Sequence, residues 1–421
     1  MKNHFPSRDA LAGLYGNRMV EDAVARLRRL ETEMEKVFPG DEPCWFFSSP
    51  GRTEVGGNHT DHQHGCVLAA AVNLDVVACV RPLQENVIRV KSIGYPMDTV
   101  DLSDLAPHEK EFGGSRGLIR GVAAALREMG YKIGGFEAVT CSSVPSGSGL
   151  SSSAAFENLV GVILSYLYNG GGIPAVELAI ASQKAENLYF GKACGLMDQM
   201  ASAVGGFAFM DFCDPNRPQI RPVRFDFSRC GYDLCIVATG GSHANLTGEY
   251  VAVPEEMKAV ARLMGAELLR DVRENDFYEA LPRLRGQVSD RALLRAMHFF
   301  KDSRRARNEA AALEQGDFSA FLQLINASGA SSFQYLQNVY PASAPQEQGL
   351  SLALALTDDF LQKKPELGGA MRVHGGGFAG TIQSFIPVSR TAEYKEMIER
   401  VFGKGACHVL AVRSAGSTII G

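Results

Sequence analysis

The segment at residues 144–155 constrains the fold of this 421-residue chain more than any other stretch. It reads Val-Pro-Ser-Gly-Ser-Gly-Leu-Ser-Ser-Ser-Ala-Ala, after an apolar, β-branched run at 136–144 and before an apolar helical pattern at 154–168. This order predicts a strand, a glycine-rich loop and a helix. The glycines let the loop turn its N–H groups toward one point, and the helix start adds unpaired N–H groups at the positive end of its dipole. Such a terminus binds anions, usually phosphate, although a glycine pattern that stands alone is by default a turn that caps the helix.

Composition and charge narrow the classes of protein to which the chain could belong. With 46% hydrophobic residues, it is long enough to form two domains with separate cores. Its net charge of −5 offers no electrostatic surface for nucleic acid. The most basic segment, at 291–307, follows a helical pattern with interspersed acids, which indicates a solvated helix face. We therefore expect no nucleic-acid partner.

The cysteines indicate a reducing compartment. All nine are scattered, and no two form a Cys-x-x-Cys pair. The sequence shows neither a signal peptide nor a run of about 18 apolar residues. We expect a cytoplasmic protein without a membrane partner, present as a monomer or a weak homodimer.

Strand and helix patterns mix along the chain without strict alternation, which predicts an α+β fold. The first 40 residues form an amphipathic helical pattern, and a short strand follows at 44–47. Residues 213–219 carry two prolines and are the predicted linker. We place the domain boundary near residue 220, which gives domains at 1–220 and 221–421. Further strands are predicted at 207–212, 221–227, 234–239, 380–387 and 407–412, and helices at 253–336, 349–363 and 392–402.

A histidine-rich segment follows the first predicted strand. His59, Asp61, His62 and His64 have a spacing compatible with Zn²⁺ ligation. The competing interpretation is a polar loop that binds a substrate. Arg52 just upstream favours this second interpretation, because its permanent charge would oppose a nearby metal ion.

Two further blocks carry chemistry-bearing residues. A second glycine-rich turn occurs at 371–380 and, taken alone, would be a tight turn that leads into the next strand. Glu186 follows Ala185 near the end of a helical pattern, and Cys-Gly-Leu-Met-Asp-Gln follows at 194–199. Glu186 and Asp198, taken individually, would be surface acids.

Taken together, these blocks resemble the galactokinase branch of the GHMP kinases. The signature of that branch reads Pro-Gly-Arg-Val-Asn-Leu-Ile-Gly-Glu-His-Thr-Asp-Tyr, and the matching stretch from Pro50 retains Arg52, Gly57, His59, Thr60 and Asp61. The phosphate-loop signature Pro-x-Gly-x-Gly-Leu-Ser-Ser-Ser-Ala-Ala is matched in full from Pro145, and the triple glycine at 375–377 matches a third block. The resemblance covers residues 40–390 and implies a two-domain GHMP kinase-like fold with the active site between the domains.

The resemblance assigns ATP and Mg²⁺ as cofactors. It implies that Ser153 and Glu186 bind Mg²⁺, which takes few protein oxygens and keeps waters and phosphates as its other ligands. The residues that would hold the ATP phosphates are Pro145, Ser146, Gly147, Ser148, Gly149, Leu150, Ser151, Ser152 and Ser153.

The resemblance also assigns catalytic and sugar-binding roles. Asp198 would accept or orient the proton of the sugar hydroxyl, and Arg52 would stabilise the charge that develops near the γ-phosphate. Tyr250 matches only a short element, so plain packing remains the alternative for it. The residues that would bind the sugar are Asn58, His59, Asp61, His62, Gly195 and Tyr250.

The chain departs from the signature at the edge of the sugar pocket. Asn58 stands where the family has a glutamate that contacts the 6-position of the sugar, and His62 replaces the tyrosine. A neutral amide there predicts tolerance for a hexose altered at the 6-position. We expect an ATP-dependent kinase that phosphorylates the anomeric hydroxyl of galactose or a related hexose.

Three alternatives remain. The enzyme could act on a 6-modified hexose such as galacturonate, or the chain could be a catalytically silent galactokinase-like sugar sensor. Retention of Arg52, Ser153, Glu186 and Asp198 argues against the sensor. A metal-dependent hydrolase built on the histidines would leave both glycine loops unexplained.

Overall fold

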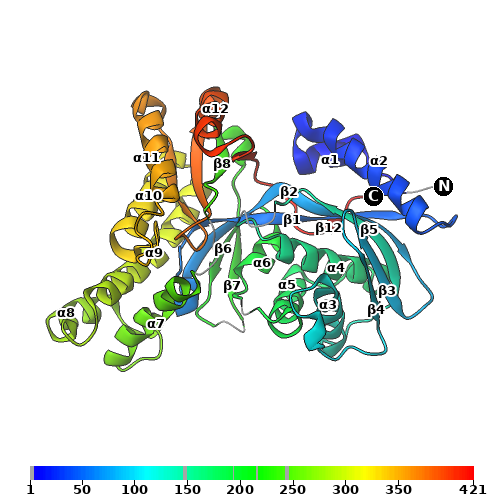
Figure 1. Ribbon diagram of the computed structural model, residues 1–421, viewed down its shortest axis with the longest axis horizontal. Helices are drawn as coiled ribbons and strands as arrows, with labels where there is room; N and C mark the ends of the chain where they lie inside the picture. The colour runs from blue at the N-terminus through cyan, green and yellow to red at the C-terminus, as the bar shows by residue number, and fades with distance from the viewer. Residues whose placement is uncertain (1–3, 146–148, 193, 215–216, 242–245) are drawn as a thin grey trace.

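Two β-sheets with helices packed on them form the framework of the protein (Figure 1). The structure is a computed structural model that describes residues 4–145, 149–192, 194–214, 217–241 and 246–421. The first sheet has eight strands in the order β12-β1-β2-β5-β3-β4, and β6 and β7 extend it from β2. The second has four strands in the order β11-β8-β10-β9. This arrangement confirms the α+β class.

The first sheet takes its strands from both ends of the chain. All neighbours are antiparallel except β3 and β5, which run parallel. Its strands are β1 (Trp45–Gly56), β2 (Cys66–Pro82), β3 (Val87–Ser92), β4 (Met97–Asp101), β5 (Phe136–Ser142), β6 (Phe207–Asp211), β7 (Gln219–Val223) and β12 (Thr418–Ile419). The strands of the second sheet are β8 (Tyr232–Ala238), β9 (Ala370–His374), β10 (Thr381–Pro387) and β11 (Cys407–Leu410).

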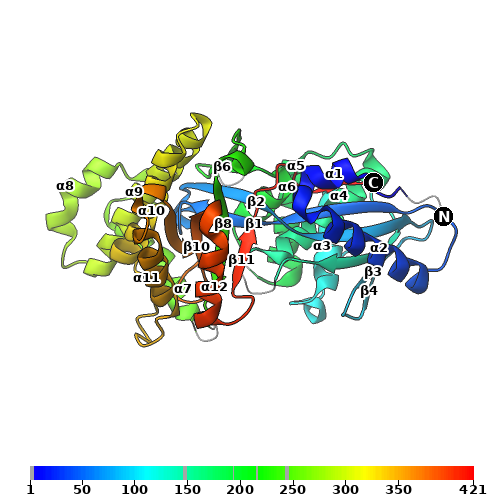
Figure 2. The same ribbon diagram turned by 90° about the horizontal axis from the view of Figure 1, so that it is seen from above.

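Helices cover both faces of the first sheet. Two amphipathic helices, α1 (Arg8–Tyr15) and α2 (Val20–Val37), pack on one face, where Leu27 and Leu30 contact Phe46 and Val77 in one core cluster. The opposite face is covered by α3 (Ser115–Glu128), α4 (Ser152–Asn169), α5 (Ala175–Ala185) and α6 (Met197–Val204), as Figures 1 and 2 show. The first sheet is therefore buried on both sides, which explains why β1 and β2 are apolar or small along most of their length.

The second half of the chain is mainly helical and lies at the other end of the long strands β1 and β2 (Figure 1). The predicted helical stretch at 253–336 divides into several helices, because Gly265 and Gly286, both at positive φ, interrupt it. The helices are α7 (Thr247–Leu263), α8 (Glu274–Leu284), α9 (Asp290–Glu314), α10 (Phe318–Ser331), α11 (Gly349–Gln362) and α12 (Thr391–Phe402), with a π-helical turn η7 (Ser332–Leu336) after α10.

Two sequence-based expectations about the first sheet need correction. The strand predicted at 44–47 continues to Gly56, so Arg52 lies on β1. The predicted linker at 213–219 joins β6 to β7 within one sheet, and the chain passes to the second sheet between Val223 and Tyr232. The domain boundary near residue 220 stays a prediction.

The basic segment on α9 is only in part the predicted solvated helix face, since the Arg304 and Arg307 side chains are 54% and 53% exposed but Arg295 is buried. The Arg295 side chain is 0% exposed, and its Nη1 lies 3.0 Å from the Glu256 carboxylate of α7, which also pairs with Arg291. Arg307 lies 3.4 Å from Asp211. Arg291, Arg295 and Arg307 thus each pair with a carboxylate on a neighbouring helix or strand, and these pairs hold α9 against α7 and β6.

Candidate active site

Arg52 and Asp198 form an ion pair between β1 and α6, in which the Arg52 side chain is buried and the Asp198 side chain is partly exposed. Arg52 Nε donates to Asp198 Oδ1 over 2.7 Å. Arg52 also donates through Nη1 to the Gly149 carbonyl, and Ser151 Oγ donates to the second carboxylate oxygen of Asp198. The two predicted catalytic residues are thus joined to each other and to the predicted phosphate loop.

The surroundings of Asp198 keep its carboxylate charged. Burial alone would raise the pKa of Asp198, but the Arg52 guanidinium and the hydrogen bonds from Arg52 and Ser151 outweigh burial and lower this pKa below its usual value. The carboxylate can therefore accept a proton only from a donor that is being activated at the same moment.

The described part of the phosphate loop leads directly into α4. Ser151 precedes the helix at φ 55° and does not cap it, since its hydroxyl is bonded to Asp198. The first turn of the 18-residue helix α4 therefore keeps its N–H groups for a ligand, and the helix dipole favours an anion there. Of the predicted phosphate ligands, Pro145 and residues 149–153 are described, and Ser146, Gly147 and Ser148 lie outside the described residues.

Ser153 and Glu186 offer two oxygens at one point, as the metal prediction requires. Ser153 Oγ donates to Glu186 Oε1 over 3.1 Å, and Lys192 Nζ contacts the same oxygen at 3.1 Å. Gln199 Nε2 holds the other oxygen at 2.7 Å and also contacts Glu157 Oε2 at 3.2 Å. A hydroxyl and a carboxylate are hard oxygen donors, so this pair fits Mg²⁺ that keeps waters and phosphate oxygens as its remaining ligands.

A cavity of about 350 Å³ opens beside this cluster. It brings together three predicted sugar ligands, Asp61, His62 and Gly195, from the turn after β1 and the loop before α6. A Cβ at position 195 would lie 3.0 Å from Asp61 Oδ2, so a side chain larger than that of glycine would crowd this carboxylate. The other lining residues are His64, Gln183, Cys194, Leu196 and Phe212.

His59 lies next to this cavity segment as a neutral, positioned imidazole. Its Nε2 donates to the Gly376 carbonyl over 2.8 Å. Burial and the nearby His62 lower the pKa of His59 to about 4. With Nε2 protonated, Nδ1 is an acceptor, and it has no hydrogen-bond partner among the described residues. Because Nδ1 is itself buried in this structure, contact between His59 and a sugar stays a prediction.

The expectation that Asn58 contacts the sugar is wrong in this structure. Its side chain is 0% exposed. The amide nitrogen donates to Glu54 and to the Gly375 carbonyl, and the amide oxygen accepts from Asn338 and Ser332. Every hydrogen-bonding position of the amide is satisfied inside the protein, so it presents no surface to a ligand.

Tyr250 belongs to α7, and its side chain packs against the second glycine turn. Its hydroxyl donates to the Gly377 carbonyl over 2.8 Å, and its ring packs edge-on against Phe378 with 5.3 Å between centroids. A side chain at Gly376 would meet the Tyr250 ring at 2.7 Å. The structure thus gives Tyr250 a packing role, and sugar contact stays a prediction.

The residues that sequence reasoning missed surround the predicted ones. Gln199 ends the matched block at 194–199 but was given no role, although it holds Glu186. His374 contacts Thr53 of β1 at 3.0 Å and links the second glycine turn to the catalytic strand. Lys192 lies outside the matched blocks, so nothing in the sequence indicated that it contacts Glu186. Only the fold shows these contacts.

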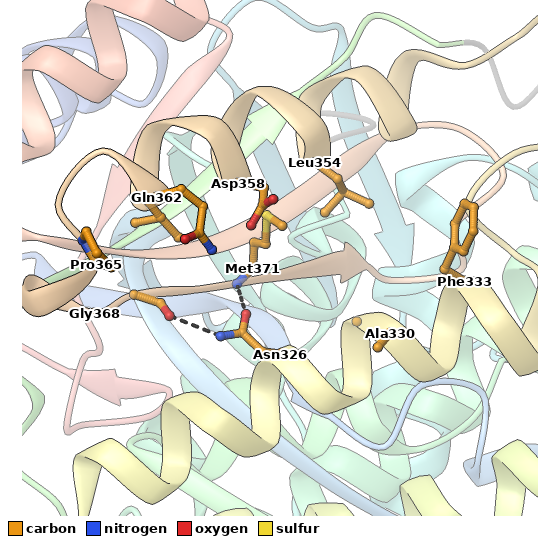
Figure 3. Close-up of a pocket in the computed structure, with 12 residues that line it drawn as sticks. Asn326, Ala330, Phe333, Leu354, Asp358, Gln362, Pro365, Gly368 and Met371 are labelled. Carbon is orange, nitrogen blue, oxygen red and sulfur yellow. Dashed lines mark hydrogen bonds between the residues drawn. The ribbon is translucent and has the colours of Figure 1, made fainter.

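Three further observations add nothing to the predicted site. Among the described residues, no group of three or more His, Cys, Asp or Glu could hold a metal ion. A second cavity, of about 500 Å³, lies between α10 and α11 and contains none of the predicted site residues (Figure 3). In the part of the chain that is described, no helix has the length and hydrophobicity to cross a bilayer.

Comparisons with known proteins agree with this geometry. The family model "GHMP kinases N terminal domain" matches residues 117–206, and "Galactokinase galactose-binding signature" matches residues 33–82. A galactokinase of Streptomyces coelicolor is 33% identical over 384 residues, which is 90% of this chain and 95% of that protein. A galactokinase of Homo sapiens is 30% identical over 90% of this chain and 93% of that protein.

A solved structure extends the similarity to the whole fold. The structure of a Lactococcus lactis galactokinase complexed with galactose superposes with a TM-score of 0.76 at 25% identity, and the match covers 93% of this chain and 99% of that one. A mevalonate kinase of Methanococcus jannaschii matches with a TM-score of 0.61 at 13% identity over 88% of this chain and 98% of that one, which shows a shared fold only.

Proposed function

The chain belongs to the galactokinase family of the GHMP kinases, and from this premise we propose that it transfers the γ-phosphoryl group of ATP to the anomeric hydroxyl of galactose. The observation that supports the proposal best is the Arg52–Asp198 pair. Arg52 bonds to Gly149 and Asp198 bonds to Ser151, both in the predicted phosphate loop. Asp198 also lies three residues after Gly195, which lines the cavity. In this proposal the ATP and sugar sites would therefore meet at one ion pair.

The pair would act on the two sides of the transferred group. As the sugar oxygen bonds to the γ-phosphorus, its proton passes to Asp198, and the bond from the phosphorus to the ADP oxygen breaks. Arg52 would face the charge that develops between nucleophile and phosphate. Because the guanidinium is buried and already oriented by Asp198, it needs no reorganisation to do so.

The N-terminus of α4 would bind the ATP phosphates, and Ser153 and Glu186 would hold Mg²⁺. When bound, the ion would neutralise phosphate charge and align the leaving group. Lys192, which contacts Glu186 Oε1 at 3.1 Å, would then be released toward the phosphates. Among the sugar ligands, the proposal retains His59, Asp61, His62, Gly195 and Tyr250.

The preference for a 6-modified hexose loses its main support, because Asn58 does not face the cavity. We keep galactose as the substrate for this reason. The free thiols of all nine cysteines fit a cytoplasmic setting, and a monomer or weak homodimer remains our proposal for the assembly.

A coupled assay of ADP release with galactose, galacturonate and glucose, with and without Mg²⁺, tests the proposal. We expect kcat/KM for galactose to exceed that for galacturonate by about a hundredfold, roughly 2.7 kcal/mol. Activity should vanish when Mg²⁺ is chelated. Thermal stabilisation by galactose without turnover would instead identify a silent sensor. A higher kcat/KM for galacturonate than for galactose would show that the substrate is a 6-modified hexose.

A further inference from the structure

The positions 54 and 58 carry the residue types of the galactokinase signature in exchanged order. The signature has Asn and then Glu where this chain has Glu54 and then Asn58. In the structure the two side chains touch, because Asn58 Nδ2 donates to Glu54 Oε1 over 2.9 Å. Two changes that meet in one hydrogen bond are expected to be coupled in their effects.

Asn58 joins four separate parts of the chain. Its side chain donates to the Gly375 carbonyl over 2.7 Å and accepts from Asn338 Nδ2 over 2.8 Å. Its backbone N–H donates to Asp302 over 2.8 Å, and its carbonyl accepts from His298 Nε2 over 2.8 Å. The residue is thus fixed by β1, by α9, by the segment after η7 and by the second glycine turn.

Glu54 supplies the charge in this arrangement. Its Oε1 accepts from Arg372 Nη2 over 2.7 Å, and Arg372 Nη1 donates to the Val55 carbonyl. Arg372 lies on β9 and is 0% exposed, so its guanidinium depends on this carboxylate for compensation. A carboxylate at position 54 and an amide at position 58 therefore satisfy both β9 and the turn that follows it.

Hydrogen bonds around Asn58 connect the predicted sugar-binding segment to the second glycine turn. Asn338 Nδ2 contacts both Asn58 Oδ1 at 2.8 Å and the Gly376 carbonyl at 3.2 Å. The same Gly376 carbonyl accepts from His59 Nε2 over 2.8 Å. A displacement of Asn58 would therefore move both the backbone that carries His59 and the carbonyl that orients its ring.

We propose that Glu54 and Asn58 form one positioning pair, in which the carboxylate at 54 and the amide at 58 hold the sugar-binding segment 57–62 against the glycine turn 375–377. The sugar part of this proposal rests on the proposed kinase function. Asn58 does not touch substrate; it acts through the adjacent His59. The order of the two residue types matters, because an ionised aspartate at 58 would present only acceptors to Glu54 and to the Gly375 carbonyl.

The test uses Asn58→Asp, Glu54→Gln and the double variant, each in the full-length protein. Asn58→Asp should raise the KM for galactose by about tenfold or more and change the KM for ATP by less than about twofold. Adding Glu54→Gln restores one amide opposite one carboxylate. The double variant should therefore have a galactose KM at least about threefold below the product of the two single effects.

Asn326→Asp is the matched control. The Asn326 amide bridges the Gly369 carbonyl at 3.1 Å and the Met371 N–H at 3.0 Å, at the other end of β9 beside the second cavity (Figure 3). Its substitution removes an amide donor to the carbonyl just before β9, whereas Asn58→Asp removes an amide donor to the carbonyl just after β9, in the glycine turn. The galactose KM of Asn326→Asp should stay within about twofold of the wild type.

Urea unfolding of the four proteins in the Glu54–Asn58 cycle separates the pair from the enzyme activity. We expect the double variant to have an unfolding equilibrium constant at least about tenfold below the product of the single effects. If the effects of the two single substitutions on the free energy of unfolding are additive in the double variant, Glu54 and Asn58 do not act as a pair. If the unfolding effects are coupled but Asn58→Asp has the galactose KM of the wild type, Asn58 does not position the sugar-binding segment. If the wild type is inactive on every sugar, the proposed kinase function is wrong, and the unfolding measurements alone then test the Glu54–Asn58 pair.

Discussion

A single ion pair links the two substrates in the proposed site. Asp198 accepts from Arg52 and from Ser151, so the same carboxylate is bonded to β1 and to the start of α4. This network explains why a partly buried carboxylate stays ionised. Its pKa is lowered because the positive partner and the two hydrogen bonds outweigh burial.

Asp198→Asn is expected to lower kcat by about a hundredfold or more, because an amide cannot accept the proton of the sugar hydroxyl. The amide oxygen can still accept from Arg52, and the amide nitrogen can donate to the Ser151 hydroxyl, so the KM for ATP should change little. Steady-state kinetics with saturating galactose measures both values. Near-normal turnover would show that Asp198 is not the base, and a shift in both KM values with unchanged kcat would point to a purely structural role.

Helix α9 meets strand β1 through a buried carboxyl group. Glu309 is 0% exposed, and a side chain on Gly56 would overlap its carboxylate, so this contact requires glycine in β1. Burial, and after it the negative charge of Asp302, raise the pKa of Glu309 to about 8, although Arg372 and Arg305 oppose the shift and Glu54 adds to it. The group is therefore neutral in the folded protein at pH 7.

The raised pKa of Glu309 predicts a pH-dependent stability. The unfolded chain releases this proton near the usual carboxyl pKa, whereas the folded chain keeps it until about pH 8. The stability that the neutral group contributes is therefore fully present below the unfolded pKa and is lost as pH rises to about 8. Relative to Glu309→Gln, the wild type should lose up to about 1.4 kcal/mol per pH unit over this window.

Urea unfolding of the wild type and Glu309→Gln from pH 5 to pH 9 measures this difference. Glu314→Gln, at the exposed end of the same helix, is the control and should run parallel to the wild type. If Glu309→Gln also runs parallel to the wild type, Glu309 is ionised in the folded protein.

At the scale of the whole molecule, one buried cluster ties both chain ends to the first sheet. Asp75 of β2 is 0% exposed and accepts from Tyr15 at 2.6 Å, Arg26 at 2.6 Å and Arg413 at 3.1 Å. Arg413 precedes β12, which pairs with β1. The N-terminal helices and the C-terminal strand are therefore held through the same carboxylate.

Asp75→Asn should lower the free energy of unfolding by about 3 kcal/mol or more, because the substitution leaves two guanidinium groups without their buried counter-charge. Its kcat should remain that of the wild type, which also makes it a buried-aspartate control for Asp198→Asn. Thermal and urea unfolding measure the loss. Glu21→Gln, which breaks the exposed pair with Arg8, should have a far smaller effect. Equal losses in the two variants would contradict the role of the cluster.

The sequence alone was sufficient for the parts of the site that depend on neighbouring residues. The strand, glycine loop and helix around 144–155 follow from residue types within a dozen positions, and the α+β class follows from local periodicity. The identity of Arg52 and Asp198 followed from their matched blocks. Their contact of 2.7 Å, across 146 residues, is visible only in the fold.

Only the tertiary structure decided which side chains reach the cavity. Asn58 was placed at the sugar because its block matched, yet its partners Gly375 and Asn338 lie 317 and 280 residues away and turn its amide inward. Arg295, which the helical charge pattern placed in solvent, is buried because Glu256 approaches from another helix. Hydrogen-bond satisfaction and charge compensation depend on what packs opposite a residue, and the local pattern does not contain that information.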